Sequence, residues 1–310
     1  MKIAFVFPGQ GSQSVGMLDA WADNDAVQQT VAEASAALGQ DLATLMRVGP
    51  AEQLNLTTNT QPVMLAAAVA IYRAWLAAGG RTPHVVAGHS LGEYSALTAA
   101  GALELGDAVR LVRIRADAMQ AAVPVGTGAM AAVLGLDDAT VMSVCAQAAH
   151  NQVVEAVNFN APAQVVIAGH KEAVDRACEL AKQAGAKRAL ILPVSAPFHS
   201  SLLKPAADVL DNALKEISVL SPQVPLVNNV DVASPADPAA IKDALVRQAW
   251  HAVRWVETVQ AMKAQGITHI VECGPGKVLS GLAKRIDSDL VALALNDPAS
   301  MKAALDTLQE

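Results

Sequence analysis

Cysteines, aromatic residues and charges are all scarce in this chain of 310 residues. Its three cysteines, Cys145, Cys178 and Cys273, are odd in number, widely spaced and without a C-x-x-C pair, which argues against a disulfide framework and against a zinc site. We therefore expect a reducing, cytoplasmic setting and no bound metal. Aromatic residues make up only 3% and charged residues only 16% of the chain, so the core must consist mainly of Ala, Val and Leu. Such a core suits helices packed on a parallel sheet.

Long apolar runs and an excess of positive charge are lacking too. No window holds about 18 uninterrupted apolar residues, and the apolar run at residues 3–7 is too short for a signal peptide. We therefore expect a soluble protein that neither enters a membrane nor is exported. The formal net charge of −7 argues against sequence-independent binding to nucleic acid, which needs a basic surface. An acidic partner would have to meet a local basic patch.

Residues 88–92 read GHSLG and lie between an apolar run at 83–87 and an Ala- and Leu-rich segment at 93–103. This pattern predicts a strand, a sharp turn and a helix, the setting of a nucleophile elbow with Ser90 at its tip. Glycine at 88 and 92 would remove collisions with the neighbouring strand and helix. A capping box, in which Ser90 caps the helix and Glu93 bonds back to it, is the alternative. A cap does not require both glycines.

Two other glycine-containing loops do not match nucleotide-binding motifs. The loop after the strand expected at residues 3–7 contains Gly9 and Gly11, but Ser14 stands where a dinucleotide fingerprint needs its third glycine. The loop at residues 274–277 has Val271 where a P-loop requires its first glycine. The first loop can still bring backbone amides close to a ligand.

A helix expected over residues 105–123 carries Arg115 on the same stripe as Leu111, Val112 and Met119. A guanidinium group that points into the core costs several kcal/mol unless an anion meets it. Two explanations remain open at this point. Arg115 either forms a buried ion pair with a nearby Asp or Glu, or it binds the carboxylate of a ligand.

The segment 126–194 differs from its flanks in its pattern of short strands and helices, which predicts a small inserted domain. Its expected elements follow the β-α-β-β-α-β order of a ferredoxin-like fold: strand 130–136, helix 137–149, strands 153–158 and 164–168, helix 171–184 and strand 188–193. The insertion divides an α/β main domain into residues 1–125 and 195–310.

His199 is the best candidate among seven histidines for a general base. It lies in a loop after an expected strand and follows Ser90 in chain order, as in hydrolases with a nucleophile elbow. His89 adjoins the serine but is expected to point away along the turn. No Asp or Glu stands out as a third member of a triad, so a backbone carbonyl could orient the imidazole instead.

Taken together, these segments show that the chain resembles malonyl-CoA:acyl carrier protein transacylases of bacterial type II fatty acid synthesis. The resemblance runs from end to end and rests on seven matches in order: residues 7–13 (FPGQGSQ), 88–97 (GHSLGEYSAL), Arg115, 158–160 (NFN), His199 with 204–207 (KPAA), Gln248 with 253–255 (VRW), and 274–279 (GPGKVL). It implies a hydrolase-like α/β main domain with a mostly parallel sheet and an inserted ferredoxin-like small domain.

The resemblance also implies catalytic roles. Ser90 would be the nucleophile, His199 its general base, and the backbone carbonyl of Gln248 would hold the imidazole. The backbone amides of Gln10 and Leu91 would form the oxyanion hole, where preorganised donors meet developing negative charge.

For the substrate, the resemblance implies that Arg115 grips the free malonyl carboxylate through two parallel hydrogen bonds. Asn160 would line the cleft between the domains, and Phe198 would crowd a branch at C2 of the acyl group, although it could simply pack the loop.

The implied reaction has two steps, in which Ser90 takes the malonyl group from malonyl-CoA and passes it to the phosphopantetheine thiol of acyl carrier protein. No metal or redox cofactor is expected, and we expect a monomer. A serine hydrolase or thioesterase is the alternative, but it would have no use for an inward cation at position 115. A non-catalytic scaffold would predict a damaged nucleophile or base.

Carrier proteins of such pathways are acidic, so the chain needs local basic docking residues. The candidates are Lys187 and Arg188 at the edge of the small domain, and Lys284 and Arg285 near the end of the main domain. Ordinary solvated surface is the alternative for all four.

Overall fold

Strand β1 (Ile3–Phe7) lies at the centre of a five-stranded sheet with the order β7-β2-β1-β8-β9. Its partners are parallel: β2 (Val85–Gly88) on one side and β8 (His269–Glu272) on the other, followed outward by β7 (Leu226–Val227) and β9 (Val291–Ala294). The computed structural model describes residues 1–194 and 196–309. Strands β1, β2 and β7 are buried along their whole length, as is typical of a parallel sheet covered on both faces, whereas the edge strand β9 is partly exposed.

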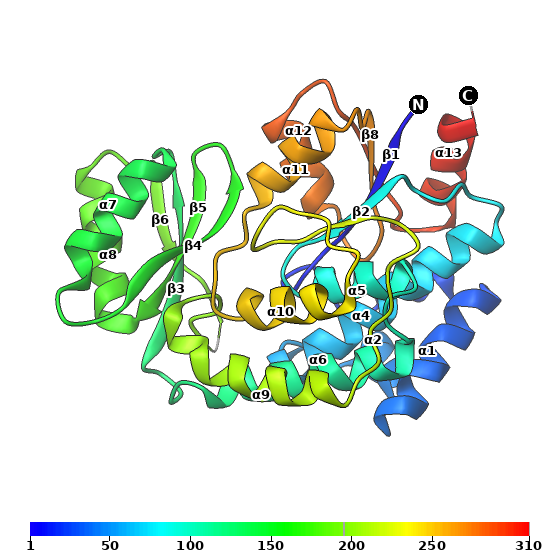
Figure 1. Cartoon of the computed structure of the whole chain (residues 1–310), viewed down its shortest axis with the longest axis horizontal. Coiled ribbons are helices and arrows are strands. Elements are labelled where there is room, and N and C mark those ends of the chain that lie inside the picture. The colour runs from blue at the N-terminus through cyan, green and yellow to red at the C-terminus, as the bar shows by residue number, and fades with distance from the viewer. Residues whose placement is uncertain (195, 310) are drawn as a thin grey trace.

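Alternating side chains of β1 pack against two different helix layers. Ile3, Phe5 and Phe7 belong to the larger core, whereas Ala4 and Val6 belong to a separate, smaller core on the opposite face. The larger core involves α1 (Asp25–Leu38), α4 (Thr57–Ala77), α6 (Leu105–Ala121) and α9 (Lys204–Lys215), and the smaller one α11 (Trp255–Ala264) and α12 (Val278–Ile286). Figure 1 shows these two groups of helices on opposite sides of the strands.

The remaining helices of the parallel-sheet region connect or flank these layers. They are α2 (Leu42–Val48), α3 (Ala51–Leu54), α5 (Gly92–Ala99), α10 (Pro238–Gln248) and α13 (Pro298–Gln309), with short 3-10 turns at Asp19–Trp21 and Ser201–Leu203.

A second, antiparallel sheet of four strands has the order β4-β5-β3-β6. Its elements are β3 (Gly128–Leu134), α7 (Asp138–Ala149), β4 (Val154–Ala161), β5 (Gln164–His170), α8 (Lys171–Gln183) and β6 (Arg188–Ile191). Both helices cover one face, around their own core, and this part forms the lobe at the left of Figure 1. The expected fold class, a mostly parallel α/β sheet with a ferredoxin-like insertion, is confirmed. The boundaries at 125/126 and 194/195 stay a prediction, and Ser195 lies outside the described residues.

Strand β4 of the small sheet contacts two segments that lie outside the parallel sheet, at Val253 and at Ser201. Phe159 N donates to Val253 O at 3.0 Å, and Val253 N donates to Val157 O at 2.8 Å. Glu155, also on β4, accepts hydrogen bonds from the backbone N–H and hydroxyl of Ser201, at 2.7 and 2.8 Å. The pocket described below lies between these two parts of the chain.

Candidate active site

The turn between β2 and α5 places Ser90 in a left-handed conformation with φ of +53°, which L-residues rarely adopt. A Cβ atom on Gly88 would come within 1.9 Å of the Gly92 backbone, and one on Gly92 would come within 2.0 Å of Phe7 O. Only glycine fits at either position. Asn229 Oδ1 accepts a hydrogen bond from Ser90 N at 2.8 Å, which holds the turn.

The capping-box alternative for Ser90 and Glu93 is wrong. Helix α5 begins at Gly92 with no side-chain cap. Ser90 Oγ instead contacts His199 and an arginine, while the Glu93 carboxylate accepts hydrogen bonds from Asn229 N and Gln248 Nε2. The serine hydroxyl therefore faces the pocket, and the glutamate faces the protein interior.

His199 is brought to the serine from the loop before α9. Its Nε2 lies 2.6 Å from Ser90 Oγ, and its Nδ1 lies 2.9 Å from the backbone oxygen of Gln248. A carbonyl oxygen only accepts hydrogen bonds, so Nδ1 carries the proton and the lone pair of Nε2 faces the serine. Burial, followed by the nearby charge of Arg115, lowers the pKa of His199 to about 3. The imidazole is therefore neutral near pH 7 and can accept a proton.

Arg115, on α6, also extends to the Ser90 hydroxyl, and it is only 2% exposed. Its Nη1 donates to Gln61 Oε1 at 2.8 Å, and its Nη2 donates to Ser90 Oγ at 3.1 Å and to Gln248 Oε1 at 3.0 Å. Its guanidinium also lies 5.3 Å from the centre of the Tyr94 ring. Among the described residues no carboxylate lies within 4 Å of it, and Arg115 Nε has no hydrogen-bond partner. The explanation of Arg115 as half of a buried ion pair is therefore wrong.

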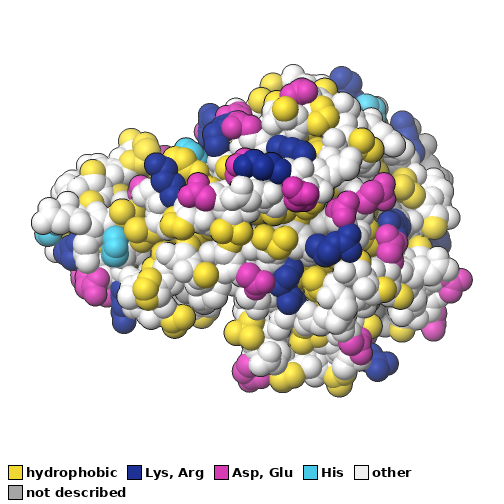
Figure 2. Space-filling view, turned by 60° about the horizontal axis from the view of Figure 1, so that its bottom comes forward, with side chains coloured by type: hydrophobic (Ala, Val, Ile, Leu, Met, Phe, Trp, Pro, Cys, Tyr) yellow, Lys and Arg dark blue, Asp and Glu magenta, His cyan; other side chains and the backbone are white. Residues whose placement is uncertain are grey.

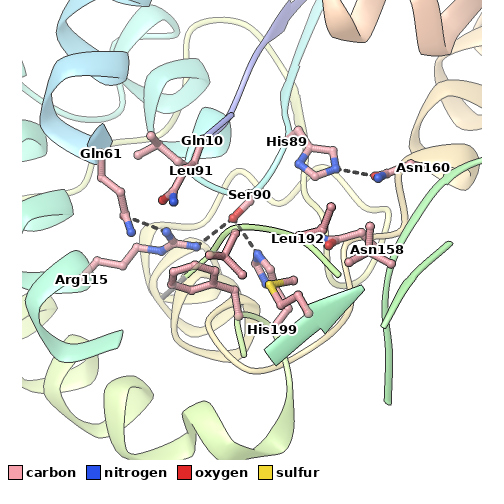
Figure 3. A pocket seen from close by; sticks show the side chains of 14 residues that line it. Gln10, Gln61, His89, Ser90, Leu91, Arg115, Asn158, Asn160, Leu192 and His199 are labelled. Atoms are coloured by element: carbon pink, nitrogen blue, oxygen red, sulfur yellow. Dashed lines mark hydrogen bonds between the residues drawn. The ribbon is translucent and has the colours of Figure 1, made fainter. Parts of the chain in front are cut away.

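Gln10 and Leu91 stand on the side of the serine opposite the imidazole, and both line the pocket (Figure 3). Gln10 follows β1 and Leu91 follows the serine, so parallel neighbouring strands bring them together. Within residues 1–194 and 196–309, no acceptor is found for either backbone N–H. Such unpaired donors beside a nucleophile suit an oxyanion hole.

The pocket around Ser90 is polar on the side of the parallel sheet and largely apolar on the side of the small sheet. Asn160 and Phe198 both line it, as do four apolar residues that the sequence did not indicate: Met130, Val166, Leu192 and Val194. His89 does not point away, as we expected, but lines the same pocket, because its Nε2 lies 2.7 Å from Asn160 Oδ1 across the two parts of the chain.

Three residues that hold the site together were missed as site residues: Gln61, Asn229 and Glu93. Asn228 and Asn229 follow an apolar run at 224–227, so a polar pair at the end of an expected strand was the available signal. Gln61 offered none, because a glutamine on a helix is ordinary.

The four candidate docking residues are all exposed and none of them lines the pocket. Arg285 donates to Gln164, and both Gln164 and Arg188 pair with Leu134 in the small sheet. Two strand spacings, roughly 10 Å, therefore separate Gln164, the partner of Arg285, from Arg188. On the face seen in Figure 2, Lys and Arg side chains are interspersed with Asp and Glu, with no large basic patch.

No group of three or more His, Cys, Asp or Glu side chains that could hold a metal occurs in the part of the chain described here. All three cysteines are free and buried. None of the described helices is long and apolar enough to span a membrane.

Comparison with known proteins agrees with this geometry along the whole chain. Residues 4–289 match the model of the acyl transferase domain family. The malonyl CoA-acyl carrier protein transacylase of Escherichia coli strain K12 is 59% identical over 306 residues, which cover 98% of this chain and 99% of that protein. The crystal structure of an acyl-carrier-protein S-malonyltransferase from Burkholderia pseudomallei 1710b is 66% identical, with a TM-score of 0.98 over 99% of this chain and all of that one.

A second solved structure contains a malonyl-transacylase in complex with its type II polyketide synthase acyl carrier protein. It is 53% identical, with a TM-score of 0.98, and the alignment covers 99% of this chain and 100% of that one.

Proposed function

Because this chain belongs to the acyl transferase domain family, we propose that it moves a malonyl group from malonyl-CoA to the phosphopantetheine thiol of acyl carrier protein, in fatty acid biosynthesis. The observation that supports malonyl as the transferred group is the environment of Arg115. A buried guanidinium without a carboxylate partner stands 3.1 Å from the nucleophile Oγ. A substrate with a free carboxylate supplies the missing anion.

In the first step, Ser90 Oγ attacks the thioester carbon of malonyl-CoA while its proton passes to His199 Nε2. The Gln248 carbonyl holds the imidazole and stabilises the imidazolium that forms. Negative charge on the thioester oxygen is met by the backbone amides of Gln10 and Leu91. The tetrahedral intermediate then expels CoA, which takes the proton from His199, and malonyl-Ser90 remains.

The second step reverses the first with a different thiol. The phosphopantetheine thiol gives its proton to His199 and attacks the malonyl ester, and Ser90 leaves with that proton. Each step moves only an acyl group and a proton, so we expect no metal or redox cofactor.

Arg115 can bind the carboxylate because its donors are not exhausted. A guanidinium has five N–H donors, and three hydrogen bonds to protein atoms are made. Acylation turns Ser90 Oγ into a poorer acceptor, so the donor that faces it becomes free for the malonyl carboxylate. Phe198 lines the pocket beside the base, where it would disfavour a branch at C2.

A serine hydrolase or thioesterase with the same elbow is the alternative function. Intact-mass measurement after addition of malonyl-CoA, and then of carrier protein, separates the two. The transferase forms a malonyl adduct that passes to the carrier, whereas a hydrolase loses the adduct to water.

The same measurement on variants tests the catalytic residues. We expect Ser90→Ala to abolish the adduct and His199→Ala to slow its formation on the order of 10²-fold or more, the range for a lost general base. An adduct that forms normally on Ser90→Ala and maps to Ser95 or Ser200 would refute the assignment of Ser90 as the nucleophile.

We further propose that the carrier protein docks at Lys187, Arg188, Lys284 and Arg285. In support, Arg188 and, through its hydrogen bond to Gln164, Arg285 lie at the same end of the small sheet. A monomer suffices for the reaction, because one chain supplies every group named above. Three free, buried cysteines support a reducing, cytoplasmic setting.

A further inference from the structure

Glu93 is a fully buried acid three residues after the nucleophile, and the reaction described above does not use it. It lies in the first turn of α5 and is 1% exposed. No Lys, Arg or His nitrogen of the described residues lies within 4 Å of its carboxylate. Its Oε2 accepts two hydrogen bonds, from Asn229 N at 2.9 Å and from Gln248 Nε2 at 3.1 Å. A buried carboxylate needs such donors.

Both of these donors belong to residues that hold the nucleophile turn. Asn229 Oδ1 accepts from Ser90 N, and Asn229 Nδ2 donates to Gly88 O at 2.6 Å. Gln248 Nε2 also donates to Ser90 O at 2.9 Å. The N–H and the C=O of Ser90 are therefore hydrogen-bonded to Asn229 and Gln248, and both of these residues also donate a hydrogen bond to Glu93.

The Gln248 side chain connects Glu93 to the substrate-binding cation. Its Nε2 end faces Glu93, and its Oε1 end accepts the hydrogen bond from Arg115 Nη2 at 3.0 Å. A carboxylate only accepts and a guanidinium only donates, so only one orientation of the amide satisfies both neighbours. Without Glu93 the NH₂ group would keep only Ser90 O as an acceptor, and its other N–H would be buried without a partner, so the amide would be held less firmly against Arg115.

We propose that Glu93 is a positioning residue, whose carboxyl group, together with Ser90 O, sets the orientation of the Gln248 amide and thereby holds Arg115 where the acyl carboxylate binds. The inference rests on the transfer reaction proposed above. Glu93 does not line the pocket, and its carboxylate accepts hydrogen bonds only from Asn229 and Gln248 among the described residues, so its effect passes through these two residues.

The acceptor oxygen of Glu93 matters more here than its full charge. Burial raises the pKa of Glu93 to about 7, against the hydrogen bonds from Asn229 and Gln248, which lower it. Charged and neutral forms therefore coexist near pH 7. Glutamine keeps one acceptor oxygen of the same reach, and both native hydrogen bonds go to a single oxygen. Glu93→Gln is therefore the conservative variant, and Glu93→Ala removes the acceptor.

The test compares acylation rates with malonyl-CoA and acetyl-CoA, measured by quenched intact mass. Loss of a buried acceptor leaves two donors unpaired, so Glu93→Ala should lower the malonyl-over-acetyl preference on the order of tenfold or more. Glu93→Gln should keep the preference within about threefold. Glu272→Ala is the matched control: Glu272 is equally buried and also accepts from a backbone N–H, that of Ser280, but it lies outside the pocket. It should leave the preference unchanged.

A double-mutant comparison shows whether Glu93 acts through Arg115. In an Arg115→Ala background, adding Glu93→Ala should not lower the malonyl-over-acetyl preference any further, because coupled residues are not additive. If Glu93→Ala does not fold, Gln248→Met is the second variant. It removes the connecting amide, keeps the backbone carbonyl that holds His199, and should also lower the preference on the order of tenfold.

The inference is overturned if Glu93→Ala slows malonyl and acetyl transfer by the same factor, or if Gln248→Met keeps the native preference. Glu93 would then only stabilise the fold. Absence of a malonyl adduct on the unaltered protein would be a different result, since it would refute the proposed transfer function itself.

Discussion

Replacing Arg115 with alanine should change which acyl group the protein accepts, more than whether it forms an acyl-enzyme. The guanidinium is 2% exposed and has no carboxylate partner among the described residues. Malonyl-CoA supplies that partner and acetyl-CoA does not. Losing one partner of a buried charge pair removes roughly 2 to 5 kcal/mol, which lowers kcat/KM for malonyl-CoA by about 30-fold to several thousand-fold.

Acetyl transfer should be equal or improved in the same variant. Arg115→Ala removes a hydrogen bond to Ser90 Oγ, but it also removes a buried cation that acetyl-CoA cannot neutralise. Arg115→Lys should rescue malonyl transfer only in part, because one ammonium group cannot reproduce a two-pronged contact.

The assay is the rate of acyl-enzyme formation with each thioester, followed by quenched intact mass. Arg113→Ala is the control, because Arg113 lies on the same helix but donates to Gln40 and Asn59, outside the pocket. It should change neither rate. A fall in malonyl and acetyl transfer by the same factor in Arg115→Ala would refute the carboxylate clamp.

The pH profile of kcat/KM gives a second readout of the same variant, since it reports the pKa of the base in the free protein. Burial and then Arg115 hold the pKa of His199 near 3, so the neutral, active form persists far below pH 6.5. The acid limb should therefore lie well below pH 6.5. Removing the Arg115 charge should move this limb upward, toward the ordinary value, and an unmoved limb would show that Arg115 has no influence on the base.

Two further predictions concern the carrier and the elbow. Charge reversal at Lys187, Arg188, Lys284 and Arg285 should slow transfer to acyl carrier protein and weaken its salt dependence, while acylation by malonyl-CoA stays nearly unchanged; equal loss in both half-reactions would indicate general damage. Gly92→Ala should lower the free energy of unfolding by about 3 kcal/mol or more, because its Cβ would meet Phe7 O at 2.0 Å. Gly281→Ala, at an exposed helical site with nothing within 4 Å, should instead raise it by about 0.5 to 1 kcal/mol. Chemical denaturation of both variants measures the difference, and similar values would contradict the steric argument.

The features that the sequence predicted are those carried by short stretches of chain. The GHSLG turn needs glycines within two residues of Ser90, and the order of the small domain follows from the periodicity of neighbouring segments. The inward face of Arg115 also followed from spacing on one helix. Each of these depends on local geometry, which a single sequence expresses directly.

The features that the sequence did not predict depend on contacts between distant residues. Asn229 holds Ser90 across 139 positions, and Asn160 turns His89 into the pocket across 71 positions. The part of Glu93 in the site depends on Gln248, 155 positions away. From the local sequence, Glu93 could be assigned only to a capping box with Ser90, because its actual partners, Asn229 and Gln248, are far away in the chain.

The central place of β1 bears on how the chain folds as it is made. β1 precedes every other strand of its sheet in the chain, yet one of its edges stays unpaired until β8, at residues 269–272, has been made. Long-range pairing of this kind slows folding, and an unpaired strand edge invites association with other chains. The small sheet, by contrast, draws all its strands from residues 128–191. We expect the small sheet to form before β8 has been made, whereas the main sheet, and with it the meeting of Ser90 and His199, must await synthesis of the chain through β8.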